Sequence, residues 1–158
     1  MALRSDLSAK ACSIARGADV LADPWILLLL RELFRGTHRF DALVTATGCS
    51  DSVTAKRLTT LREAGLVIRV PYREGGRERH EYRLTAAGAD TLPILHALSR
   101  WGARHTPDHG TLDISCARCE TRPPSADWCP TCALPLTANV TIWRAPTSPE
   151  VPERLSGS

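Results

Sequence analysis

Two pairs of cysteines near the C-terminus carry the most specific chemistry in this sequence. Cys116 and Cys119 form one C-x-x-C pair, Cys129 and Cys132 form another, and nine residues separate the two pairs. Two such pairs can converge on one tetrahedral zinc ion with four thiolate ligands, and a site with four protein ligands leaves no position for a substrate. The spacing therefore predicts one structural zinc per chain. A dithiol redox pair and a rubredoxin-like iron centre stay open as alternatives.

The other two cysteines, Cys12 and Cys49, require a separate interpretation. Asp6 precedes any long apolar stretch, so we expect no secretion signal, a cytoplasmic location and reduced thiols rather than disulfides. Cys12 opens the first predicted helix, where the helix dipole can lower the pKa of a thiol. We therefore take Cys12 as a candidate redox switch. The alternative is that Cys12 is a small buried residue that packs the first helix.

Helical signals follow one another through the first 65 residues. Asp23-Pro24 is an N-cap and first-turn proline for a helix that ends at Gly36, and a short helix that begins near Phe40 ends at Gly48. Ser50 caps the next helix, which Gly65 closes, with Val53, Leu58 and Leu61 expected to face inward. Its outer face is small, polar and basic, which is what a helix-turn-helix places in a DNA major groove.

The segment after Gly65 predicts a β-hairpin. Residues 66–73 are rich in Val, Ile and Tyr, Glu74-Gly75-Gly76-Arg77 is a turn, and residues 80–84 alternate polar and apolar with Tyr82 and Leu84 inward. Arginines on this hairpin can lie along a phosphate backbone or in a minor groove. We interpret the hairpin as the wing of a winged helix-turn-helix.

Apolar residues from Leu92 to Trp101 predict a last long helix that Thr85 can cap, and Pro93 should kink it or shift its start by a turn. Its apolar face is wide enough to pack on a partner as well as on the core. Trp25 and Trp101 are expected to be core anchors, and Ile14 to face inward from the first helix. Pro and Ser dominate from Thr147 onward, which predicts disorder.

Charge divides along the chain. Residues 1–106 hold 16 Lys and Arg against 11 Asp and Glu, a formal charge of +5, whereas residues 107–158 hold 4 against 6, a charge of −2. Arg outnumbers Lys in the first part, and the arginine fork suits phosphate and guanine edges. No apolar run approaches the length of a membrane span, and no hydrolase elbow, phosphate loop or pair of catalytic carboxylates stands in a convincing context. We expect a protein that is not an enzyme and does not enter a membrane.

The order of these elements and several local strings resemble the HxlR family of winged helix-turn-helix regulators over residues 11–105. The resemblance implies a homodimer formed through the first and last helices, a palindromic operator with half-sites about one helical turn apart, and thiol control in some members through a cysteine near Cys12. The strings that carry it are Cys12-Ser13-Ile14-Ala15, Asp23-Pro24-Trp25, Arg39-Phe40-Asp41, Arg57-Leu58, Ala64-Gly65-Leu66-Val67, Glu81-Tyr82-Arg83-Leu84-Thr85, Leu92-Pro93 and Trp101-Gly102.

These observations predict a mainly α fold with a small β-hairpin (α+β), a winged helix-turn-helix followed by a zinc-ribbon-like knuckle. We expect an N-terminal arm (1–10), a DNA-binding and dimerisation domain (11–105), a zinc tail (106–145) that lies outside the main core, and a disordered C-terminus (146–158). The protein would regulate transcription at the nucleoid, as a repressor of genes under a small-molecule or oxidant inducer. A protein–protein interaction module is the alternative. The residues expected to contact double-stranded DNA are Ser50, Ser52, Thr54, Lys56, Arg57, Thr60, Arg73, Arg77 and Arg79.

Overall fold

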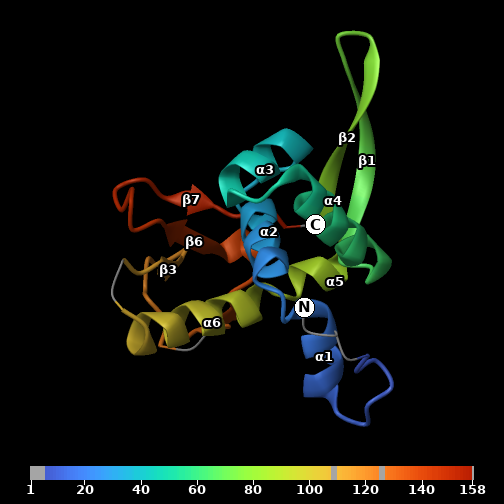
Figure 1. Ribbon diagram of the computed structural model, residues 1–158. Coiled ribbons are helices and arrows are strands. Elements are labelled where there is room, and N and C mark those ends of the chain that lie inside the picture. The colour runs from blue at the N-terminus through green and yellow to red at the C-terminus, as the bar shows by residue number, and fades with distance from the viewer. Residues whose placement is uncertain (1–5, 108–109, 125–126, 158) are drawn as a thin grey trace.

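Helix α2 (Pro24–Phe34) occupies the centre of the computed structural model, which describes residues 6–107, 110–124 and 127–157 (Figure 1). The Asp23 carboxylate accepts hydrogen bonds from the N–H groups of Trp25 and Ile26 at 3.0 and 3.3 Å, and Gly36 ends the helix with a φ of +86°. Both ends were predicted. Six of its eleven residues are buried, and each large apolar side chain removed from water contributes about 1.5–3 kcal/mol.

The helix-turn-helix and the wing form as the sequence predicts. Gly48 has a φ of +70° in the turn between the two helices, and Gly75 and Gly76 make the turn of the hairpin, both with positive φ. The hairpin is antiparallel from Val67–Leu84 at its base to Glu74–Arg77 at its tip, and it projects from the body of the molecule (Figure 1). The elements are α3 (Phe40–Thr47), α4 (Asp51–Glu63), β1 (Val67–Glu74) and β2 (Arg77–Leu84).

The first helix differs from the expectation in its packing. Helix α1 (Ser13–Leu21) begins after Cys12 as predicted but has no buried residue, and it extends away from the body (Figure 1). Ile14 is 81% exposed, so the expectation that it faces the core is wrong. The prediction assumed that an apolar helix face packs within its own chain.

The last helix is broken near its start. Thr85 caps only the short helix α5 (Ala86–Ala89), and α6 (Leu92–His105) begins afresh with Pro93 in its first turn. This is the shift that Pro93 predicts, because proline lacks the N–H that a helix interior needs. Trp101 is 57% exposed, so it is not a core anchor, and Trp25 is half-buried.

Residues 106–157 are hereafter called the C-terminal extension, and the parts of it that the structure describes fold against the helices rather than apart from them. Ile114, Ala138, Trp143 and Leu155 belong to the same hydrophobic core as α2, so the expected boundary between a main domain and a separate tail is wrong. The extension contains a three-stranded antiparallel sheet in the order β3-β6-β7 and a small β4-β5 hairpin. Its elements are β3 (Asp113–Cys116), β4 (Trp128–Cys129), β5 (Leu134–Pro135), η1 (Ala138–Val140), β6 (Thr141–Arg144) and β7 (Glu153–Arg154).

The C-terminal residues expected to be disordered are ordered as far as residue 157. Strand β7 pairs with β6, Leu155 is buried, and the Ser156 N–H donates to the Phe34 carbonyl at 2.7 Å. The Ser156 hydroxyl also donates to the Leu33 carbonyl at 3.1 Å. These bonds satisfy carbonyl groups at the C-terminal end of α2, a long-range role that local composition does not reveal. Residues 1–5 of the expected N-terminal arm, and Ser158, lie outside the described residues.

None of the helices in the described part of the chain combines the length and hydropathy that a bilayer span requires.

Candidate DNA-binding surface and metal site

Helix α4 is held in place by its caps and by one buried face. The Ser50 hydroxyl accepts a hydrogen bond from the Val53 N–H at 3.4 Å, which caps the N-terminus as predicted. Thr54, Leu58 and Leu61 are the buried residues, at the i, i+4, i+7 spacing of one helix face. That face packs on α2 and α3 and leaves the opposite face in solvent.

The solvent face of α4 carries part of the predicted DNA-contacting set. Ser50, Ser52 and Lys56 are exposed, whereas Thr60 is half-buried. The hydroxyl of Thr60 donates to the Lys56 carbonyl at 3.1 Å, and the hydroxyl of Thr59 donates to the Ala55 carbonyl at 3.0 Å. Thr59 is exposed and lies on this surface as well, although the sequence analysis did not select it for DNA contact.

Two of the predicted contacts are corrected. Thr54 is fully buried, so it is not available to a base, and the prediction of Val53 as the inward residue is one residue out of register. Arg57 turns toward the start of α2, where its Nη2 lies 2.7 Å from Asp23 Oδ2, and both side chains are about three-quarters buried. Arg57 therefore links α4 to α2. Its guanidinium, which was predicted to contact DNA, is engaged in this ion pair instead.

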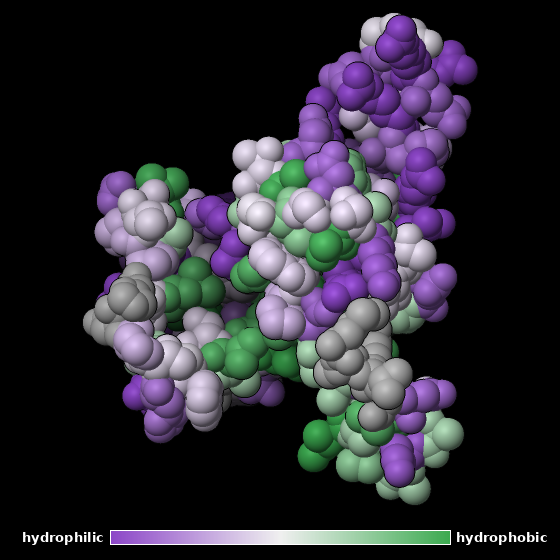
Figure 2. All heavy atoms as spheres, in the orientation of Figure 1, coloured by the Kyte–Doolittle hydropathy of each residue, from purple (hydrophilic) through white to green (hydrophobic). Residues whose placement is uncertain are grey.

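The wing presents its arginines to solvent. Arg73, Arg77 and Arg79 are all exposed, and the visible face of the projecting β1–β2 hairpin is mostly hydrophilic (Figure 2). Arg79 has a long ion pair, 3.7 Å from its Nε to Glu74 Oε2. Exposed pairs of this kind contribute little, so the guanidinium can exchange Glu74 for a phosphate.

Arg39 connects the wing to α3, a residue that sequence analysis missed as a functional group. Its Nη1 lies 3.0 Å from Glu74 Oε1, and its guanidinium carbon is 4.9 Å from the centre of the Tyr72 ring. The hydrogen bond with Glu74 raises the pKa of Arg39 above its ordinary value. A β-bridge between Arg39 and Glu81 brings together two chain segments that are about forty residues apart. The contact of Arg39 with the wing depends on this long-range pairing, so no local sequence signal predicts it. Arg39 thus links the start of α3 to the wing.

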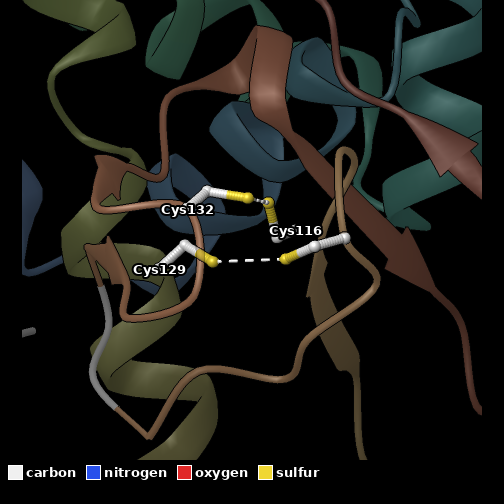
Figure 3. A group of neighbouring side chains, drawn as sticks. Cys116, Cys129 and Cys132 are labelled. Atoms are coloured by element: carbon white, nitrogen blue, oxygen red, sulfur yellow. Dashed lines mark hydrogen bonds between the residues drawn. The ribbon is translucent and has the colours of Figure 1, made fainter.

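The four tail cysteines meet in one cluster (Figure 3). Their sulfur atoms all lie within 4.8 Å of one another, with Cys116 Sγ 4.0 Å from Cys132 Sγ and Cys119 Sγ 3.5 Å from Cys129 Sγ. A tetrahedral ion with metal–sulfur bonds of about 2.3 Å places its ligands roughly 3.8 Å apart. The cluster already has these dimensions, so the four thiols could hold one metal ion.

The backbone on both sides of the cluster has the shape of a metal-binding knuckle. Glu120 and Ala133 each follow the second cysteine of a pair, and each has a left-handed φ, +56° and +52°. Such a conformation costs a non-glycine residue roughly 1–2 kcal/mol, so its occurrence at equivalent positions of both pairs indicates a common constraint. Ala133 occupies the position where glycine is typical, and the backbone adopts the glycine-like conformation there nonetheless.

The clustered thiols have pKa values that are shifted in opposite directions. Hydrogen bonding with Thr121 lowers the pKa of Cys119, whereas the neighbouring Cys119 sulfur raises the pKa of Cys132. The cluster alone thus favours one thiolate at the expense of another. A divalent ion removes this conflict because it stabilises all four thiolates together.

The remaining cysteines lie in different environments. Cys12 is exposed at the N-cap of α1, where its side chain makes no capping hydrogen bond. Cys49 is buried in the turn before α4. Cys12 is therefore not the small packing residue of the alternative interpretation, and its thiol is accessible.

The model of the HxlR-like helix-turn-helix family matches residues 20–110, more than half of the chain. The chain belongs to the HxlR-like helix-turn-helix family. This confirms the resemblance and the winged-helix fold, and the family match ends before the first metal-site cysteine. The cysteine cluster is thus an addition to the part of the chain that the family model describes.

Named relatives of this HxlR-like chain are transcriptional regulators, in agreement with a protein that is not an enzyme. The uncharacterised HTH-type transcriptional regulator Rv3095 of Mycobacterium tuberculosis is 41% identical over 95 residues, which are 60% of each chain. The regulator sll1512 of Synechocystis is 39% identical over 58% of this chain and 68% of its own. The chain therefore spans about 60% of the length of the mycobacterial relatives that it matches.

The structural comparison extends into the C-terminal extension. The structure of PA1607, a candidate transcription factor, superposes with a TM-score of 0.69 at 29% identity and covers 85% of this chain and 94% of its own. This coverage is wider than residues 20–110, so part of the extension has a counterpart there. The redox regulator HypR in its reduced form, at 24% identity and a TM-score of 0.54, shares the fold.

We predict that the purified protein holds one metal ion per chain and that Cys129→Ser abolishes this stoichiometric binding, measured by elemental analysis. Because the extension shares the main core, metal removal by a chelator should also lower the unfolding temperature by about 2–4 °C for each kcal/mol that the metal contributes to folding.

Cys49→Ser is the matched control, since it removes a buried thiol outside the cluster and should retain the metal. A Cys129→Ser protein that still binds one ion per chain would show that the four thiols are not the ligands.

Proposed function

We propose that this protein is a homodimeric, sequence-specific transcription regulator that binds double-stranded DNA at the nucleoid. The supporting observation is the combination of an exposed polar α4 face with a wing of three exposed arginines beside it. An α-helix fits the major groove, where each base pair presents a distinct pattern of donors and acceptors. Ser52 and Lys56 are the groups proposed to reach bases. The alternative function is a protein–protein interaction module, in which the same face of α4 binds a protein partner. A lack of DNA binding would favour this alternative.

The wing is proposed to bind phosphate and not bases. Arg77 stands at the tip of the hairpin, and its neighbour Arg79 exchanges Glu74 for a phosphate oxygen. Phosphate contacts release counterions and set the position of the protein without reading sequence. Ser50, whose hydroxyl caps α4, and the half-buried Thr60 contribute to the surface next to the helix.

We propose repression as the sign of regulation, because a helix seated in the major groove with a wing across the backbone occupies DNA that other proteins need. Transcription from the operator-bearing promoter should then fall when the protein is added. An increase in transcription in that assay would show that the protein is an activator, and the DNA-binding proposal would still hold.

The homodimer rests on an exposed apolar stripe along α6. Ile94, Leu98 and Trp101 are 46%, 46% and 57% exposed, and they lie on one face at the i, i+4, i+7 spacing. Helix α1 has its own exposed apolar residue, Ile14. A two-fold arrangement that buries these residues would direct two α4 helices to half-sites about 34–36 Å apart on a palindromic operator.

Zinc is the metal proposed for the cysteine cluster, with a structural role. Four thiolates are a soft ligand set that suits zinc, and all four positions are taken by protein, so no site is left for substrate. The elemental analysis also tests the alternatives: iron would indicate a rubredoxin-like centre, and a metal-free disulfide a redox pair.

We predict that Lys56→Ala costs about 1–3 kcal/mol on the selected operator and much less on random DNA, because a base contact is lost. Arg77→Ala and Arg79→Ala should weaken binding to both duplexes alike and flatten the salt dependence, since they lose only phosphate contacts. Fluorescence anisotropy with an operator selected from a random pool gives both affinities.

Arg118→Ala is the control, because it removes one exposed arginine of the extension outside the wing. If Lys56→Ala and the wing variants changed both duplexes by the same factor, the proposed division between α4 and the wing would be wrong.

We predict that Trp101→Glu weakens the dimer by at least about 30-fold, because a central aromatic residue of an interface contributes about 2 kcal/mol or more. Ile14→Glu tests the α1 side of the same interface. Val151→Glu is the matched control, since Val151 is 51% exposed but lies in the extension. Sedimentation equilibrium provides the dissociation constants, and a Trp101→Glu protein as dimeric as Val151→Glu would refute this interface.

Cys12 stays a candidate redox switch, and we predict that diamide lowers DNA affinity at least about tenfold in the wild type but not in Cys12→Ser. The exposed thiol lies on α1 beside the proposed dimer contact, so its modification would disturb the spacing of the two α4 helices. Zinc is kept saturating so that the four tail thiols stay protected. Cys49→Ser serves as the matched control, and equal losses in Cys12→Ser and wild type would exclude Cys12.

A further inference from the structure

A cavity of about 520 Å³ lies where α2, α6 and the C-terminal extension meet. This volume is within the roughly 300–1,000 Å³ range of small-molecule sites. Each of the three segments supplies a wall: Leu27 from α2, Leu95 and Leu98 from α6, and Leu112 and Trp143 from the extension. Hydrophobic atoms line the junction of α6 with the body of the protein (Figure 2).

The extension contributes a rigid aromatic wall to the cavity. Trp143 is 1% exposed and its indole Nε1–H donates to His96 Nε2 at 2.9 Å, which fixes the ring against α6. The ring also packs on Phe34 of α2, with centroids 6.3 Å apart. The wall is therefore preformed, and an incoming ring would lose little protein entropy on packing against it.

Arg31 supplies the polar group of the cavity. Its Nε and Nη2 each lie 2.8 Å from Glu32 Oε1, whereas its Nη1 has no hydrogen bond to any residue in the described ranges. The other lining guanidinium, Arg35, is already engaged by Glu153 and Glu32. Arg31 thus has a free N–H edge for an acceptor oxygen and a planar face on which an aromatic ring can stack.

The cavity is distinct from the apolar stripe proposed for the dimer. At about 100° per residue, the direction of Leu95, Leu98 and Ser99 around α6 differs by roughly 90° from that of the stripe. Leu98 is the residue that the two surfaces share. A second copy on the stripe would border the cavity rather than fill it.

We propose that this cavity is an effector site for small aromatic molecules that carry an acceptor oxygen. The regulatory part of this inference rests on the proposed function. A bound ring would contact α2, which supports α4 on its other side, and Leu98, which borders the dimer stripe. Occupancy therefore changes the relative positions of the two DNA-reading helices of a dimer, through elements that are packed against one another.

The site is tested with 1-anilinonaphthalene-8-sulfonate, an aromatic sulfonate that fluoresces in apolar surroundings. Wild-type protein with its metal should bind about one molecule per chain in a saturable titration. Ser99→Phe fills the cavity from α6 and Ala145→Phe fills it from the extension, and each should weaken binding at least about tenfold. Two variants are used so that a folding defect in one leaves the other informative, and Ile68→Ala, which removes an exposed apolar side chain of the wing, should bind as the wild type does.

Unchanged dye binding in both filled variants would overturn the proposal. So would a loss of dimer affinity in the filled variants with dye binding retained, because the cavity would then hold a second copy of the chain. The last arm measures operator affinity with and without saturating dye, and a change of at least about fivefold is expected. Stoichiometric dye binding by a protein that binds no DNA would refute the proposed function but keep the cavity as a ligand site.

Discussion

The buried carboxylate of Glu32 is the constraint on which the arrangement of the two parts of this protein depends. Glu32 is 2% exposed on α2, and it is neutralised by Arg31 and by Arg35, whose Nη1 lies 3.3 Å away. Arg35 in turn binds Glu153 of β7 at 2.7 and 2.8 Å, and the hydrogen bonds to Glu153 raise the pKa of Arg35. Breaking a buried ion pair costs about 3–5 kcal/mol, and Arg35, which pairs with both Glu32 and Glu153, joins α2 and the extension in one ionic network.

Helix α2 transmits this arrangement to the DNA-binding side. Its C-terminal carbonyls are satisfied by Ser156 of the extension, while Asp23 at its N-terminus holds Arg57 of α4 at 2.7 Å. The same helix thus carries a contact with the extension at one end and with the recognition helix at the other. A change in how the extension packs therefore reaches α4 through one rigid element, and the guanidinium of Arg57 serves that linkage instead of DNA.

The features that depend on neighbouring residues in the sequence were predicted correctly. The predictions that failed concern residues whose positions depend on long-range contacts. The caps at Asp23 and Ser50, the left-handed glycines and the wing could be predicted because neighbouring residues determine them. The inward position of Thr54 could not, because a helix of low apolar content allows two neighbouring faces and only packing on α2 selects one. The order of residues 146–157 was missed for a related reason: Ser156 and Glu153 bind partners more than one hundred residues away. The spacing of the four cysteines predicted their cluster, because two C-x-x-C pairs at this separation are typical of a four-thiolate site.

The C-terminal extension also explains the width of the apolar surface of α6, because this surface packs on the extension as well as carrying an exposed stripe. His96 and Leu95 face the extension, where His96 accepts the Trp143 hydrogen bond, and this covers one part of the apolar surface. What stays exposed is the narrow stripe of Ile94, Leu98 and Trp101. The buried apolar residues of the extension mostly join the core around α2, and a metal ion bound by the four cysteines would add folding free energy. The extension thus divides the apolar surface of α6 into a part buried within the chain and an exposed stripe, which is the surface proposed for a second copy.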